Sequence, residues 1–346
     1  MNVTSSTPLV LPYQNTDPAI QGAWNFARTG SSVLGRVTLG EGASMADYAV
    51  VRADGHVVEI GDGFHLGERS TIHIAHALYG TYVGHHVSVG RNAVVHACRV
   101  GNDCVIEDSA VILDGAEVGA GSIIGAHSVV FPRTVLEGGQ RYEGVPAKPV
   151  GAADAAMLEA AHRAVRAAAP LGGPALPHFV AGAQSQLAPG AYVASTVTGQ
   201  GDLKMESGSS IWFSCVIDTS AGNYVSVGRD SNVQDNTVMR ALAAPIRIGA
   251  GCTIGHNVHL QDCTVGDRSL VGMGSTIAPG TVIEDDVLLA AGSTTTPGQV
   301  LSAGGMWGGR PARLLSTLDE KKKTMIAWSY DIYCGYARDY LAVESA

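Results

Sequence analysis

The chain has 346 residues, of which 44 are glycine, while only 6% are aromatic and only 15% are charged. The net charge of −9 argues against nucleic acid or an anionic membrane surface as a partner. No stretch reaches the ~18 consecutive apolar residues that a membrane span needs. The composition is unusual for a helical or Rossmann-type enzyme and suits a solenoid, in which small residues fill tight corners and aliphatic residues fill a narrow core.

Targeting and redox signals point to the cytoplasm. The first residues contain no basic segment followed by an apolar one, so no secretory signal is predicted. None of the cysteines stands in a CxxC pair, and we expect all of them to be reduced and mostly buried. They are Cys98, Cys104, Cys215, Cys252, Cys263 and Cys334.

Aliphatic residues recur at every sixth position through the first half of the chain, from Leu39 to Val130. Two loops interrupt the register, one between Val51 and Ile60 and one between Ile72 and Val83, and one five-residue step separates Val95 from Val100. A period of six fits neither the 3.6-residue helix nor the two-residue alternation of a strand. It predicts a triangular coil of about 18 residues with three short strands, each pointing one aliphatic side chain inward. Such coils are stable only when stacked.

The second half repeats this pattern. An Ala-rich segment at 152–168 predicts a helix, and the Pro- and Gly-rich segment at 170–178 predicts a linker. The six-residue period then returns from Val227 to Leu289, and a second helix is expected over 314–341. We therefore predict a first domain at 1–169 with a trailing helix, a linker at 170–178, and a second domain at 179–346.

Several segments resemble one known family, the γ-class carbonic anhydrases of the hexapeptide-repeat superfamily. The chain looks like a tandem, fused pair of them. The resemblance implies an all-β solenoid of two left-handed parallel β-helix domains, each followed by a C-terminal α-helix. The segments that carry it are GVPAKPV at 144–150, GGRPARLL at 308–315, the Arg-x-Asp segment at 39–54, NVQDNTVM at 232–239 and IGHNVHLQDCTVG at 254–266.

In that family a metal ion lies between neighbouring β-helices, held by two histidines of one subunit and a third of its neighbour. An Arg-x-Asp pair and a Gln-Asp pair surround it. The first domain matches at Arg52, Asp54, His73 and His96. Its Gln, Asp and third-His positions carry Gly67, Glu68 and Arg91.

The second domain keeps the opposite set. It matches at Gln234, Asp235 and His256. The Arg-x-Asp positions and the other two His positions carry Asp218, Ser220, Arg240 and Gln261.

The coil period sorts these residues by face. Arg52, His73 and His96 stack on one face of the first domain, whereas Gln234 and His256 share the other type of face in the second. Each domain has lost the face that the other has kept. Placed side by side, the two domains would rebuild one complete site, with each family position present once.

The resemblance implies a metal-dependent lyase in which His73, His96 and His256 bind Zn²⁺, with Fe²⁺ or Co²⁺ as alternatives. Water activated by the metal would attack CO2, or the site would serve a repurposed reaction on a small carboxylated or acylated metabolite. Gln234, Arg52, Asp54 and Asp235 would form the catalytic surroundings. Self-association into a homo-oligomer is expected.

Two other hypotheses remain open. One is a hexapeptide-repeat acyltransferase or thioesterase, with a histidine as general base and pantetheine bound along the solenoid. The other is a non-catalytic assembly subunit that keeps its histidines as relics.

Overall fold

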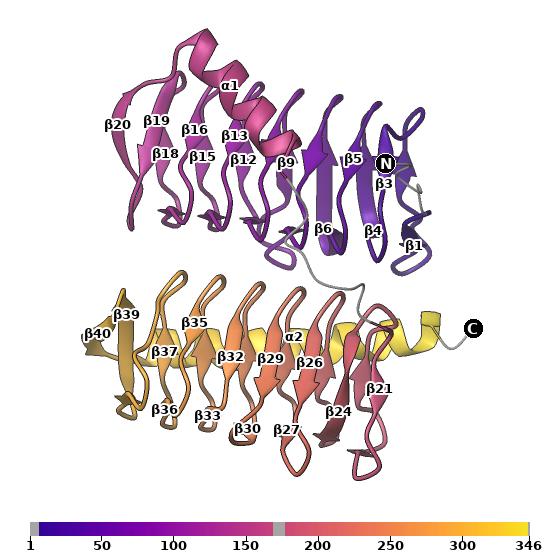
Figure 1. Cartoon of the computed structure of the whole chain (residues 1–346), viewed down its shortest axis with the longest axis vertical. Coiled ribbons are helices and arrows are strands. Elements are labelled where there is room, and N and C mark those ends of the chain that lie inside the picture. Colours follow the sequence, from indigo (N-terminus) through magenta and orange to yellow (C-terminus); the bar gives the residue numbers. More distant parts are fainter. Residues whose placement is uncertain (1–6, 169–176, 345–346) are drawn as a thin grey trace. The chain divides into compact units, whose positions relative to one another are not determined.

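The computed structural model describes residues 7–168 and 177–344. The chain forms two compact units, Met1–Gly172 and Gly173–Ala346, each a parallel β-helix (Figure 1). The six-residue period is therefore confirmed as a solenoid repeat. Most of the predicted linker at 170–178 lies outside the described residues.

Two sheets form the walls of the first unit. The larger contains β1 (Leu9–Leu11), β2 (Ala19–Ile20), β4 (Ser32–Leu39), β6 (Val50–Ile60), β8 (Thr71–His73), β9 (Thr81–Val83), β11 (Val94–His96), β12 (Arg99–Val100), β14 (Val111–Ile112), β15 (Glu117–Val118), β17 (Val129–Val130) and β18 (Val135–Leu136). The smaller contains β3 (Phe26–Ala27), β5 (Ser44–Met45), β7 (His65–Leu66), β10 (Ser88–Val89), β13 (Val105–Ile106), β16 (Ile123–Ile124), β19 (Gln140–Glu143) and β20 (Lys148–Ala152). Because β4 and β6 each pair with strands of two rows, the larger sheet covers two of the three faces.

The second unit repeats this arrangement. Its larger sheet contains β21 (Val180–Ala181), β22 (Gln186–Leu187), β24 (Thr198–Met205), β26 (Val216–Thr219), β27 (Tyr224–Val227), β29 (Val238–Ala241), β30 (Ile246–Ile248), β32 (His259–Gln261), β33 (Thr264–Val265), β35 (Thr276–Ile277), β36 (Val282–Ile283) and β38 (Val300–Leu301). Its smaller sheet contains β23 (Tyr192–Val193), β25 (Ser210–Ile211), β28 (Asn232–Val233), β31 (Thr253–Ile254), β34 (Leu270–Val271), β37 (Leu288–Leu289), β39 (Gly305–Gly309) and β40 (Ala312–Thr317).

Inward-pointing aliphatic residues form the core of each unit. In the first unit Val51, Ile72, Val95 and Ile112 occupy one face of successive coils and are fully buried. Full burial of one such side chain contributes about 1.5–3 kcal/mol. The residues on either side of each inward residue face outward, because side chains alternate along a strand. Each short strand therefore presents one or two outward positions.

One helix packs on the smaller sheet of each unit (Figure 1). Helix α1 (Ala155–Arg166) is capped by the Asp154 side chain and lies over β10 and β13. Helix α2 (Glu320–Glu344) lies over β23, β25, β28 and β31, where Tyr333 and Tyr340 contact the ring of Trp212. No helix of the described residues is long and apolar enough to cross a membrane.

Both predicted helices begin later than expected. The first starts at Ala155 rather than 152, and the second starts at Glu320, whereas the prediction began it at 314. In each unit the last coil is followed by an antiparallel hairpin, β19–β20 or β39–β40, and its second strand occupies the residues assigned to the start of the helix. This strand pairs the backbone groups that the last coil would otherwise leave open.

Candidate metal centre

Two histidines lie side by side on one face of the first unit. His73 ends β8 and His96 ends β11, and the two residues are paired in register. Each follows an inward, fully buried aliphatic residue, so each imidazole projects outward. The Nδ1 atom of His73 lies 3.4 Å from the Nε2 atom of His96. The prediction that the two residues lie on one face, one coil apart, is confirmed.

Carboxylates hold the far nitrogens of both rings. Asp54 Oδ2 lies 3.1 Å from His73 Nε2 and also accepts a hydrogen bond from the guanidinium of Arg52. Asp114 Oδ1 lies 2.6 Å from His96 Nδ1. An ionised carboxylate only accepts hydrogen bonds, so in the neutral imidazoles these far nitrogens carry the protons.

Consequently the two facing nitrogens present lone pairs to each other. Lone pairs at 3.4 Å repel unless a cation lies between them. Tetrahedral Zn²⁺ with Zn–N bonds of 2.0–2.1 Å separates two ligand nitrogens by about 3.3 Å. The spacing and the protonation pattern of His73 and His96 therefore fit a pair of metal ligands.

The second unit brings Gln234, Asp235 and His256 together at the corner that follows β28 and β31. Asp235 Oδ2 lies 3.1 Å from His256 Nδ1, and Asp235 Oδ1 accepts a hydrogen bond from the backbone N–H of Phe213. Both Asp235 and His256 are fully buried. The Nδ1 atom of His256 lies within ion-pair distance of Asp235 but makes no hydrogen bond with the described residues, so the contact does not fix the tautomer of this ring.

The amide of Gln234 is fixed from one side only. Its Nε2 donates to Asn232 Oδ1 at 3.2 Å, and Asn232 in turn donates to the Thr253 hydroxyl at 3.0 Å. The Oε1 atom of Gln234 is buried and accepts no hydrogen bond from any residue in the described ranges. This carbonyl can therefore accept a hydrogen bond from a substrate or a water molecule.

Most of the positions that each unit has lost are occupied by other charged or polar residues, and Gly67 in the first unit is the exception. Arg91 stands on the coil corner equivalent to His256 and forms a two-pronged ion pair with Asp108. In the second unit Arg240 is paired in register with Asp218 on one side and Gln261 on the other. Asp218, Arg240 and Gln261 thus take the places that Arg52, His73 and His96 hold on successive coils of the first unit. The structure thus assigns these residues to the faces that the coil period predicted.

Two residues near the candidate centre were missed by the sequence analysis. Asp114 lies on the coil that follows His96, and Asn232 lies two residues before Gln234. Counting one further coil from His96 indicates Leu113, because Val95 pairs with Ile112; Asp114 lies one residue beyond that, at the corner, where the register does not predict a contact. The position of Asn232 is occupied in the first unit by His65, whose pKa is lowered to about 4, mainly by burial.

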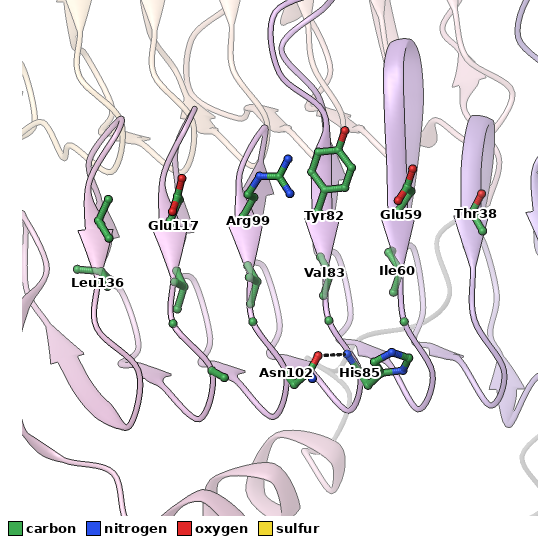
Figure 2. A pocket seen from close by; sticks show the side chains of 18 residues that line it. Thr38, Glu59, Ile60, Tyr82, Val83, His85, Arg99, Asn102, Glu117 and Leu136 are labelled. Atoms are coloured by element: carbon green, nitrogen blue, oxygen red, sulfur yellow. Dashed lines mark hydrogen bonds between the residues drawn. The ribbon is translucent and has the colours of Figure 1, made fainter.

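A shallow groove runs along a different face of the first unit (Figure 2). Its volume is about 670 Å³, and Glu59, Tyr82, Arg99 and Glu117 form a ladder of outward side chains across successive coils. The Arg99 guanidinium lies 4.1 Å from the centre of the Tyr82 ring. The only histidine in its lining is His85, which is half exposed. The groove is therefore separate from the histidine pair.

Two segments of the chain match family models of hexapeptide-repeat proteins. The model described as "Bacterial transferase hexapeptide (six repeats)" matches residues 97–132, and "Hexapeptide repeat of succinyl-transferase" matches residues 263–297. These matches and the two β-helices define a protein of the hexapeptide-repeat class.

Individual relatives narrow this class. "Gamma carbonic anhydrase 1, mitochondrial" of Arabidopsis thaliana is 36% identical over 159 residues, which are 44% of this chain and 58% of the relative. "Carbonic anhydrase" of Geobacillus kaustophilus is 36% identical over 140 residues, covering 40% of this chain and 76% of the relative. "Protein YrdA" of Escherichia coli is 32% identical over 149 residues, covering 41% of this chain and 80% of the relative.

The chain therefore belongs to the γ-class carbonic anhydrase family and carries two family-like β-helices in tandem. Its match spans a little over half the length of the plant relatives, 58% for the first of them.

Proposed function

We propose that the chain is a metal-dependent, γ-carbonic-anhydrase-like lyase that interconverts CO2 and bicarbonate at one composite site. His73 and His96 of the first domain and His256 of the second would hold a single ion. The observation that carries this proposal is the complementary loss: the first unit keeps the two-histidine face, the second keeps the one-histidine face, and neither keeps both. Undirected decay would rarely sort the residues in this way.

The donor set supports a metal ion. Three neutral imidazoles suit Zn²⁺, and a carboxylate holds the other ring nitrogen of His73 and of His96. Ligand type alone does not distinguish Zn²⁺ from Fe²⁺ or Co²⁺. When bound, Zn²⁺ supplies a nucleophile at neutral pH because it lowers the pKa of water towards about 7.

The other family positions would arrange the reactants. Gln234, whose Oε1 accepts no hydrogen bond from the described residues, would accept one from the attacking water. Asp54 fixes the ring of His73, and Asp235 lies 3.1 Å from the ring of His256. Arg52 neutralises the buried carboxylate of Asp54 in its own domain. We further propose that Arg52 forms a salt bridge with Asp235 that joins the two domain faces.

The proposal extends to the substrate, the cellular compartment and the self-association of the chain. The substrate is a small molecule, CO2 or, in the repurposed form of the proposal, a small carboxylated or acylated metabolite. The cysteines are all free, which supports a reducing compartment such as the cytoplasm. We further propose that the chain self-associates, as expected for a β-helix family whose metal lies between subunits.

The composite site is tested by removing one ligand from each domain. Zn²⁺ content and the rate of CO2 hydration would be measured for the wild type, His73→Ala and His256→Ala. His127→Ala and His259→Ala are matched controls, since neither residue belongs to the proposed ligand set. Both ligand variants should lose the metal and the activity, although they alter different domains. A His256→Ala variant that keeps the metal and the full rate would refute the composite site.

The second candidate, an acyltransferase, rests on the groove of Figure 2, which runs along the solenoid as an extended pantetheine would. Acyl-CoA turnover that chelators do not inhibit, and that Arg99→Ala abolishes, would favour it. A chain with no activity and no stoichiometric metal would favour the assembly subunit.

A further inference from the structure

Asp114 lies beside the candidate centre and has no role in the proposed function. It follows β14, two residues beyond the inward Ile112, at the corner next to His96. Its Oδ1 lies 2.6 Å from His96 Nδ1. The side chain of Asp114 is 42% exposed, whereas those of Asp54 and Asp235 are completely buried. Asp114 thus reaches the candidate centre from the surface of the first unit.

We infer that Asp114 is a positioning residue that prepares His96 for the metal; this inference rests on the proposed function. By accepting the Nδ1–H of His96, the carboxylate fixes the ring in the tautomer whose lone pair is on Nε2. That atom is the one that faces His73 Nδ1 at 3.4 Å. Asp114 then serves His96 as Asp54 serves His73, and a carboxylate in this position also strengthens the imidazole as a donor.

Comparison of the two units supports a role tied to the ligand. The strand equivalent to β14 in the second unit is β35, and the residue equivalent to Asp114 there is Pro279. The residue equivalent to His96 is Gln261, at the end of β32. The unit that has lost the histidine has therefore also lost the carboxylate. A residue that served only the corner of the coil would have no reason to change together with the histidine.

The position of Asp114 also allows a clean test, because a half-exposed aspartate can be shortened without opening a cavity in the core. Asp114→Ala removes the acceptor, whereas Asp114→Asn keeps an amide oxygen that can still accept from Nδ1–H but without the charge. Glu117→Ala, on the same coil but on another face, is the matched control. Co²⁺ is the probe, because its affinity is measured by competition with a chelator and its visible spectrum reports the ligand geometry.

We expect Asp114→Ala to bind Co²⁺ about 10–100-fold more weakly than the wild type, with a changed visible spectrum. Asp114→Asn should lie between the two, and Glu117→Ala should match the wild type. The melting temperature of each metal-free variant should stay at the wild-type value. Equal Co²⁺ affinities and spectra for Asp114→Ala and Glu117→Ala would overturn this inference alone. A wild-type chain that binds no Co²⁺ would overturn the proposed function with it.

Discussion

Removal of the metal should destabilise both units of the chain at once. Under the proposed function one ion is held by His73 and His96 from one unit and by His256 from the other. The perturbation is a chelator, and the measurement is the thermal unfolding of each unit with and without added Zn²⁺. Because ligand binding stabilises only the folded state, the shift in melting temperature reports the binding free energy.

The expected shift follows from the geometry of the donors. The two facing nitrogens of the first unit are 3.4 Å apart, within about 0.1 Å of the separation in a tetrahedral Zn²⁺ site, so binding requires little rearrangement there. At a free Zn²⁺ concentration one hundred times the Kd, binding stabilises the folded chain by about 2.7 kcal/mol. For a unit of this size that corresponds to a rise of roughly 5–11 °C in melting temperature.

The ligand variants make the assay specific. The Zn²⁺-induced shift of each variant is compared with its own metal-free form, so that any loss of packing cancels. His96→Ala and His256→Ala should each abolish the shift in both units. A chain in which His256→Ala removes the shift from the second unit only, while the first unit keeps it, would show two separate sites and refute the shared ion.

Three further predictions concern the scaffold. The pKa of His65 is about 4 in the folded chain and 6.5 in the unfolded chain. Between pH 6.5 and pH 4 the unfolded chain therefore takes up a proton at this residue that the folded chain does not. The free energy of unfolding should therefore fall by about 3 kcal/mol as the pH drops from 6.5 to 4. His65→Asn, which introduces the residue found at Asn232, should flatten that slope in urea titrations. Ile112→Ala, at a fully buried position, should cost about 2–5 kcal/mol in urea unfolding, against less than about 0.5 kcal/mol for the exposed Val135→Ala. Burial raises the pKa of Cys104 to about 11, so its thiol should react with a disulfide reagent at pH 8 only after denaturant is added.

The sequence predicts the β-helix well because its period leaves no other regular structure. Every inward position fills the same narrow core, so one short aliphatic residue recurs at the same place on each coil, and even the five-residue step from Val95 to Val100 is visible as a shortened corner. The antiparallel hairpins that follow the last coil of each unit are harder to predict from the sequence. Residues 312–317 have no hexad pattern, and the edge of the last coil, which they cover, exists only in the folded structure.

Some features of the candidate site could likewise be predicted from the sequence, and others could not. Register follows from counting, so the pairing of His73 with His96 and the separate face of Gln234 and His256 could be predicted. Hydrogen bonds between side chains could not, because they depend on rotamers and on corners. Asp54 and Arg52 lie two residues apart on the same strand, yet only the structure shows that one carboxylate serves both the guanidinium and His73.

Local packing around the family positions that each unit lacks does not favour the missing residues. In the first unit Arg91, at the position of the missing histidine, is locked by two hydrogen bonds to Asp108. A side chain at Gly67, the position of the missing glutamine, would bring its Cβ to 2.4 Å from the carbonyl oxygen of Gly90. In the second unit Pro279 removes the carboxylate that would hold a histidine at Gln261. A returning ligand would therefore have to displace the Arg91–Asp108 ion pair or the Gly90 backbone in the first unit, and would find no carboxylate at position 279 in the second. The two units thus differ face by face, as the proposed composite site requires.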